Sequence, residues 1–183
     1  GGGTFGKVVE LKLWEHFTKS PLPGYDKRLP QRGLICYLNN ETGEISKSIP
    51  EVEKGQNKHK RIEIDLIFYS EQGGYALLES KALSGVNSVK PELYLKGGQF
   101  FNNEKLPELF VLTFYKYEHE RLFPRKQQIL KLKSKVIEEL RIPEFKVLYL
   151  NLPLAKDQAK VNYQNFIDQP TLNLIDALKE LNL

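Results

Sequence analysis

The stretch RIEIDLIFYSEQGGYALLESKAL, residues 61–83, decides the fold of this 183-residue chain. Its first part alternates apolar residues with others at a period of two, and its second part, GYALLESKAL, is a largely apolar run; both patterns are typical of β-strands. Between them, EQGG supplies turn residues. The stretch therefore predicts a β-hairpin in which Glu79 and Lys81 share one face of the second strand.

Two acidic residues interrupt these apolar strands, although buried charge is costly and aspartate is disfavoured in strands. If residues 71–74 form the turn, Asp65 faces Ser80, whereas a shift of one residue places it opposite Glu79. In the second register the two carboxylates lie about 5 Å apart at Cβ. Mg²⁺ takes only one or two carboxylates, so the pair can share this cation. A structural salt bridge between Asp65 and Lys81 is the alternative.

The rest of the chain predicts an α/β fold around this hairpin. Apolar periodicity predicts helices at residues 4–17, 91–103, 124–141 and 171–181, the second interrupted by Gly97 and Gly98. An extra hairpin is expected at residues 34–49, and buried strands at residues 109–117 and 145–153. We expect one domain, residues 1–183, in which a mixed central sheet is flanked by helices. Its core covers residues 4–151, and a C-terminal extension covers residues 152–183.

Composition and charge narrow the class of protein. The net charge is +4, and basic residues cluster at 54–61 and 124–135, which permits attraction to phosphates but also fits ordinary solvated surfaces. No stretch reaches the length of a membrane span, and no signal-peptide pattern is present. A lone cysteine, Cys36, excludes an intramolecular disulfide framework. The sequence thus predicts a cytoplasmic protein with no membrane partner.

The spacing D-(13 residues)-E-S-K, preceded by an acidic residue on a helix, resembles the PD-(D/E)XK (restriction-endonuclease-like) superfamily. The resemblance covers residues 4–151 and implies an αβββαβ core. One departure is that Ile64 stands where the motif has its proline. The resemblance implies that Asp65 and Glu79 hold a metal ion, Mg²⁺ or Mn²⁺, with the Ser80 backbone carbonyl as a further ligand, and that Lys81 is the catalytic lysine.

Two further positions follow from the same resemblance. The acid of the first helix, expected as a further metal ligand and catalytic residue, is assigned to Glu10, with Glu15 as its rival. Some subfamilies carry a glutamine on the helix after the lysine strand, which corresponds to Gln99. Glu63 is either an additional acid near the metal or the surface partner of Arg61.

The function that the resemblance implies is Mg²⁺-dependent hydrolysis of phosphodiester bonds. The expected activity is that of a DNA endonuclease of restriction, repair, recombination or mobile-element type, acting as a homodimer or within a larger protein or complex. Two alternatives remain open at this stage. One is a catalytically inactive nucleic-acid-binding or assembly module on the same fold, and the other is a protein-interaction domain whose acids are structural.

Overall fold

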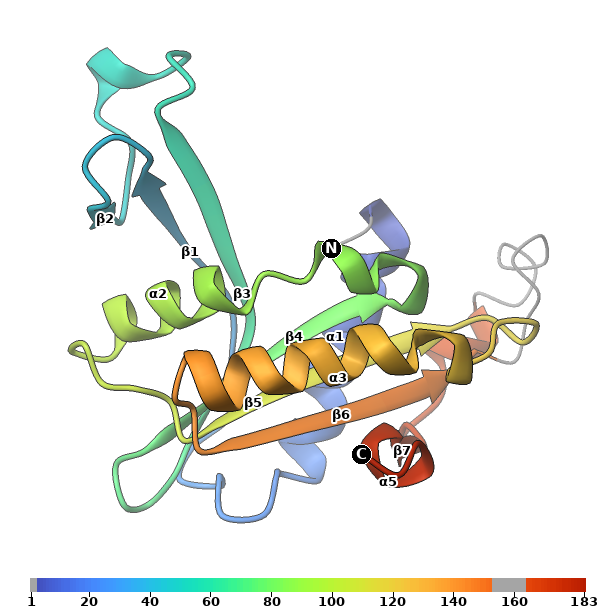
Figure 1. Cartoon of the computed structure of the whole chain (residues 1–183). Coiled ribbons are helices and arrows are strands. Elements are labelled where there is room, and N and C mark those ends of the chain that lie inside the picture. Colours follow the sequence, from blue (N-terminus) through green and yellow to red (C-terminus); the bar gives the residue numbers. More distant parts are fainter. Residues whose placement is uncertain (1–2, 153–163) are drawn as a thin grey trace.

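A computed structural model describes residues 3–152 and 164–183 of the chain (Figure 1). Its helices are α1 Gly3–Lys19, α2 Pro91–Phe101, α3 Lys126–Ser134 and α5 Ala177–Glu180. Its strands are β1 Gln31–Asn39, β2 Ile45–Ser46, β3 His59–Tyr69, β4 Tyr75–Ala82, β5 Leu109–Lys116, β6 Glu144–Asn151 and β7 Leu174–Asp176. Short 3-10 turns are η1 Glu51–Glu53, η2 Leu83–Ser88 and η3 Phe123–Arg125, and α3 continues into a π-helical turn, Lys135–Glu139.

The strands of the described residues form one open seven-stranded sheet in the order β2-β1-β3-β4-β5-β6-β7. The pairs β4–β5 and β5–β6 are parallel, and the remaining neighbours are antiparallel. A mixed sheet flanked by helices is therefore confirmed. The hairpin expected at residues 34–49 is also present, although its second strand is only two residues long.

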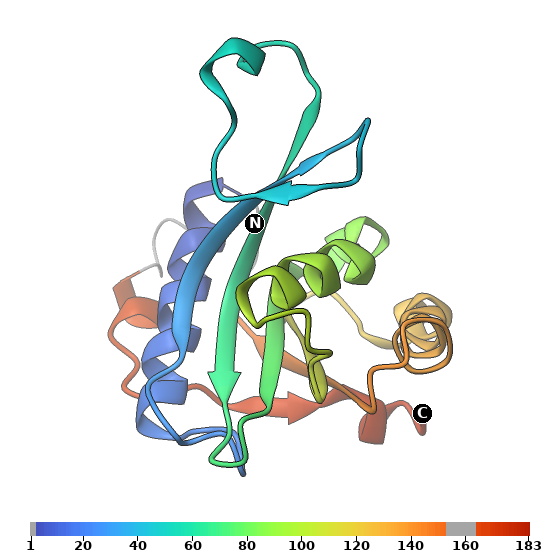
Figure 2. The ribbon, with the colours of Figure 1, turned by 90° about the vertical axis from the view of Figure 1, so that its left-hand side faces the viewer.

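Helices cover both faces of the sheet (Figure 2). On one face α1 packs through Val9, Leu13 and Phe17 into a buried cluster that also contains Leu66 and Leu78. On the other face α2 and α3 pack over a second cluster, which contains Leu77, Tyr94 and Ile129. Buried apolar side chains on both faces of the central strands explain why the hairpin sequence is so rich in them.

Gly97 and Gly98 weaken the helical pattern of α2 but allow it to lie close to the sheet. A Cβ atom on Gly97 would stand 3.0 Å from Ile64 Cδ1, and one on Gly98 would stand 2.9 Å from Leu77 Cδ1. Side chains at these two positions would push α2 away from β3 and β4. The helix expected at residues 91–103 is thus present, and tertiary packing accounts for its glycines.

The helix expected over residues 171–181 is wrong in its first half. Leu174–Asp176 forms β7, which pairs antiparallel with β6 through Leu150↔Leu174 and Leu148↔Asp176, and the helix is confined to Ala177–Glu180. Asp176 fixes this late start, because its Oδ1 accepts a hydrogen bond from the Lys179 N–H at 3.1 Å. Residues 153–163 of the expected C-terminal extension, and the last residue of the strand expected at 145–153, lie outside the described residues.

No helix within residues 3–152 and 164–183 is both long and apolar enough to cross a lipid bilayer.

Candidate active site

The predicted hairpin opens into a fork at its polar end. β3 and β4 pair only from Tyr69↔Tyr75 to Leu66↔Leu78. Beyond that point β3 pairs with β1 alone, and β4 pairs with β5 alone. Asp65 and Glu79 are the first residues on the two sides of this opening, which we call the β3–β4 fork.

The register of the hairpin brings these two acids level. Leu66 pairs with Leu78, so the register that sets Asp65 opposite Ser80 is wrong, and the shifted register is the one observed. The turn is one residue shorter than EQGG, since the Ser70 N–H donates to the Gly74 carbonyl and leaves residues 71–73 as the turn. Asp65 nevertheless reaches Ser80, because its Oδ2 accepts a hydrogen bond from the Ser80 N–H at 2.7 Å. This bond ties the two branches of the fork together.

Asp65 also stands where β3 changes faces. Ile62 and Ile64 belong to the cluster under α2 and α3, whereas Leu66 and Phe68 belong to the cluster under α1. The strict alternation expected for this strand is therefore wrong at Asp65. On β1, the ladder to β3 omits Gly33, which has a φ of +66°, between Arg32↔Leu66 and Leu34↔Ile64. A glycine tolerates this backbone conformation without a steric penalty.

Because of this kink, Asp65 meets side chains from both helical layers. The carboxyl group of Glu10 on α1 hydrogen-bonds to Asp65, and so does the hydroxyl of Tyr94 on α2. Burial, followed by the hydrogen bond and charge of Glu10, raises the pKa of Asp65 well above its ordinary value. Two carboxylates this close repel each other when both are ionised. The raised pKa of Asp65 therefore reflects negative charge that neighbouring groups do not neutralise.

Glu79 and Lys81 lie on the branch formed by β4. The Glu79 side chain is buried, its Oε2 has no hydrogen-bond partner, and burial raises its pKa to about 7. Lys81 Nζ stands 3.9 Å from Glu79 Oε1, and its side chain is about one quarter exposed. Among the described residues the ion pair of Lys81 is thus with Glu79, and the expected alternative of an Asp65–Lys81 salt bridge is not formed.

The two rival acids of α1 occupy different environments. Glu10 is only 3% exposed, touches Asp65 and leaves its Oε1 without a partner. Its Oε2 lies 3.4 Å from Lys7 Nζ. Glu15 is half-exposed and pairs with Lys12, which also donates to the carbonyls of Ile167 and Gln169. Of the two, Glu10 is the one that the fold brings to the fork.

Two other residues considered from the sequence lie further from the acids. Gln99 is near the C-terminal end of α2, where its Nε2 donates to the Glu104 carbonyl at 3.3 Å, and it lines a different cavity. The fold does not bring Gln99 to the fork. Glu63 lies at the rim of the fork and pairs with both Arg61 and Lys7.

Tyr94 and Lys90 are the residues near the acids that the sequence pattern did not single out. Both line the fork cavity, which has a volume of about 230 Å³ and includes Asp65, Glu79 and Lys81. Tyr94 is buried, and burial followed by the charges of Asp65 and Glu79 raises its pKa well above the ordinary value, so its hydroxyl stays protonated. A tyrosine on an amphipathic helix carries no recognisable motif, so only the fold assigns it here.

The donor set of the fork suits a hard divalent cation with water in its coordination sphere. No three His, Cys, Asp or Glu side chains within residues 3–152 and 164–183 gather closely enough to hold a metal ion unaided. Mg²⁺ needs no such cluster, because it commonly takes one or two carboxylates and retains several waters. Two buried carboxylate oxygens at the fork, Glu10 Oε1 and Glu79 Oε2, have no partner. Buried polar atoms are normally satisfied, so both are available to a ligand.

Comparison with protein-family models, curated proteins and solved structures finds no match to this chain.

Proposed function

We propose that this protein is a metal-dependent nuclease of the PD-(D/E)XK type that hydrolyses phosphodiester bonds in DNA as an endonuclease. One observation carries the proposal. At the fork where β3 and β4 separate, the buried acids Asp65 and Glu79 stand on the two branches with Lys81 beside Glu79, and the buried Glu10 of α1 reaches Asp65. A purely structural role does not account for such a cluster, because like carboxylates at close range are costly without a counter-charge.

The order of the elements supports the same assignment. α1, β1, β3, β4, α2 and β5 follow one another as in an αβββαβ core, with β2 as an addition to β1. The acids lie on the second and third strands of that core, and the helix that contributes Glu10 packs across the same sheet. The resemblance of the sequence motif and the arrangement of its residues therefore lead to one proposal.

The metal is assigned to Asp65, Glu79 and the backbone carbonyl of Ser80, with Mg²⁺ or Mn²⁺ as the ion. When bound, such an ion neutralises charge on the scissile phosphate and lowers the pKa of water. The hydrogen bond from the Ser80 N–H holds Asp65 in place across the fork. Glu10, which hydrogen-bonds to Asp65 and is held from the other side by Lys7, positions the Asp65 carboxyl group.

Lys81 is the residue that contacts the reacting groups in this proposal. Its ammonium group lies beside Glu79 and lines the fork cavity, so it can orient an attacking water or stabilise negative charge that develops on the phosphate oxygens. Tyr94 lines the cavity, and its hydroxyl donates a hydrogen bond to Asp65.

The test is cleavage by the purified chain of supercoiled, linear and branched DNA and of RNA, with and without Mg²⁺. The proposal predicts Mg²⁺-dependent cleavage of circular DNA, loss of cleavage in Asp65→Asn and Glu10→Gln, and full activity in Glu15→Gln. The Glu15 variant is a matched control, because it removes the same charge from the same helix outside the fork.

Three results would contradict the proposal. Full activity in Asp65→Asn would show that this acid takes no part in the reaction. Cleavage from the ends of linear DNA alone would show that the protein is an exonuclease and not an endonuclease. If the unaltered protein binds DNA but cleaves none of it, the protein is a nucleic-acid-binding module on this fold.

A further inference from the structure

A second cavity adjoins the fork on the face of the sheet that carries α2 and α3. It has a volume of about 580 Å³ and lies between η2 and the helix formed by α3 and its π-helical turn. We call it the η2–α3 groove. Lys90 lines both this groove and the fork cavity, so the two hollows share a wall.

The lining of the η2–α3 groove combines positive charge with amide side chains. Its lysines and amides are Lys90, Lys131, Lys135, Asn87, Gln127 and Gln128, and one acid, Glu139, lies among them. Lysines attract phosphate oxygens, and amides both donate to phosphates and contact base edges. Gln128 Oε1 is buried without a hydrogen-bond partner, which leaves an acceptor available inside the groove.

Lys135 is a lysine of the groove that already holds an anionic partner. Its Nζ lies 3.0 Å from Glu92 Oε2. Both partners of this pair are partly exposed, so a phosphate can take the place of Glu92 at little cost. The groove thus contains a cation whose present partner is exchangeable.

The other basic run, residues 54–61, does not make a comparable surface. Lys54 pairs with Glu51 at 2.7 Å, and Lys58 lies 4.0 Å from Glu41. This run belongs to the long projection formed by β1, β2, η1 and the start of β3 (Figure 1), which also carries Glu41, Glu51 and Glu53. Its charges are largely balanced locally, whereas lysines outnumber acids in the η2–α3 groove.

We propose that the η2–α3 groove binds one strand of the nucleic-acid substrate and leads its backbone past Lys90 to the fork. This inference rests on the proposed nuclease function and adds the path of the strand to it. In this arrangement Lys131 and Lys135 contact phosphates, and the amides of Gln127 and Gln128 contact the adjacent sugars or bases. The occupant is a single strand, because the groove's cations adjoin one reaction centre through the shared residue Lys90.

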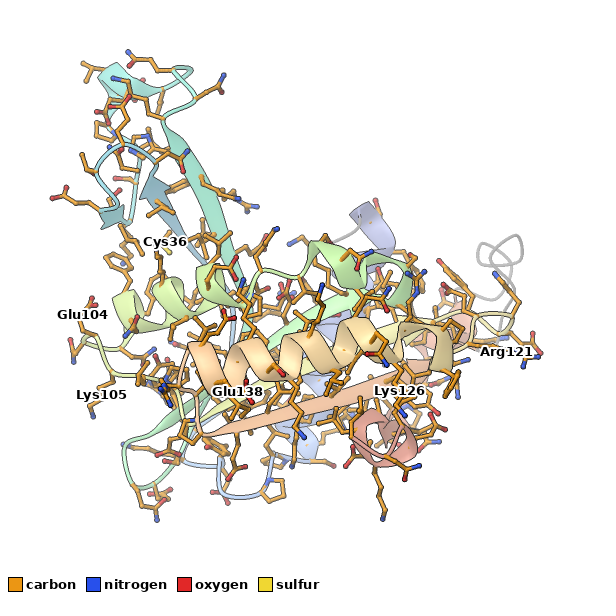
Figure 3. All side chains as sticks on the ribbon, in the orientation of Figure 1. Cys36, Glu104, Lys105, Arg121, Lys126 and Glu138 are labelled. Atoms are coloured by element: carbon orange, nitrogen blue, oxygen red, sulfur yellow. The ribbon has the colours of Figure 1, made fainter. Side chains whose placement is uncertain are left out.

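The test measures binding in protein that carries Asp65→Asn, so that the probe stays intact. A fluorescent single strand of about 16 nucleotides, as DNA and as RNA, is titrated by anisotropy over a range of salt concentrations. The double variant Lys131→Gln/Lys135→Gln is compared with Lys126→Gln. Lys126 is a matched control on the same helix, at the end opposite Glu138 (Figure 3), and it does not line the groove.

The groove variant should bind the strand about tenfold more weakly than the parent, whereas Lys126→Gln should leave affinity unchanged. The slope of log affinity against log salt should fall by about 0.7 for each lysine removed. Equal losses in the two variants, or none in either, would overturn the groove as the path of the strand. The proposed function would then stand or fall separately, on cleavage by the protein with Asp65 intact.

A parent protein that binds neither probe would overturn the groove as well, and if it also cleaves nothing with Asp65 restored, the nuclease proposal fails with it.

Discussion

The two ends of the β3–β4 hairpin are built from the same pair of strands and are equally buried, yet they differ in chemistry. At the closed end, where Tyr69↔Tyr75 to Leu66↔Leu78 pair, the buried side chains are apolar and pack into both clusters. At the open end, Asp65 and Glu79 are 3% and 4% exposed, but their partners are other polar groups. Burial therefore has different effects at the two ends. It stabilises the fold at the closed end, and it raises the pKa values of Asp65 and Glu79 at the open end.

The largest effect is expected from Lys81→Ala at the open end, which should change cleavage but not stability. Because Lys81 is assigned to the reacting phosphate and its side chain is partly exposed, cleavage should fall about a thousandfold, or about 4 kcal/mol in activation free energy. The free energy of unfolding should change by less than about 0.5 kcal/mol. Initial cleavage rates and urea unfolding measure the two quantities. A fall in both by similar energies would mean that Lys81 is structural.

The converse substitution is Leu77→Ala at the closed end. Leu77 is fully buried under α2, so its truncation should lower the free energy of unfolding by about 3 to 4 kcal/mol. Cleavage per folded molecule should be unchanged, as measured at a urea concentration where both proteins are folded. A large loss of specific activity with little loss of stability would contradict the division between the two ends.

The free energy of unfolding should depend on pH because of Glu79 at the open end. Burial raises the pKa of Glu79 from 4.5 to about 7, so the folded protein holds this proton more tightly than the unfolded chain does. Without divalent metal, the resulting stability is complete below about pH 4.5 and is lost as pH rises toward 7, by up to about 3 kcal/mol. Urea unfolding across this window should show the decline, and Glu79→Gln should make it shallower and leave the part that comes from Asp65, whose pKa is also raised. A parallel decline in both proteins would assign it to other groups.

The smallest effect concerns the packing of α2 on the hairpin. In Gly98→Ala, the new methyl group would stand within 3.1 Å of both Leu77 Cδ atoms, and the expected loss of about 1 to 3 kcal/mol exceeds the gain of about 1 kcal/mol in helix propensity. Gly85→Ala is the control, because its nearest neighbour, Ser88 Oγ, lies at an ordinary 3.5 Å. Thermal unfolding should show a lower midpoint for the Gly98 variant alone. Equal midpoints would mean that α2 shifts without cost.

The sequence pattern was sufficient for the parts of the fold that depend on local periodicity. Alternating and apolar runs located β3, β4, β5 and β6, and a charged residue in an apolar strand marked Asp65 as unusual. The register depends on the length of the turn, and both lengths were compatible with the residues EQGG until the bond from the Ser70 N–H to the Gly74 carbonyl distinguished them. The change of faces at Asp65 coincides with Gly33 in the neighbouring strand, which lies outside the hairpin's own run of residues.

Long-range contacts explain the other differences. β7 forms because β6 offers an unpaired edge, which overrides the helical spacing of residues 171–181. Tyr94 reaches Asp65 because Gly97 and Gly98 bring α2 close to the sheet. Gln99, chosen by its place in the chain, lies past the point where α2 faces the fork. Which residue of α2 reaches the fork therefore depends on the side of the helix that packs against the sheet, and its place in the chain alone did not predict it.

The most direct measurement of the central claim is calorimetric titration of the purified chain with Mn²⁺ at neutral pH. We predict a binding signal that disappears in Asp65→Asn and in Glu79→Gln and persists in Glu15→Gln, because the fork supplies the ligands and α1 supplies only Glu10. Mn²⁺ binding that both fork substitutions leave unchanged, or an unaltered protein that binds no Mn²⁺, would contradict the account of the β3–β4 fork as a metal-dependent active site.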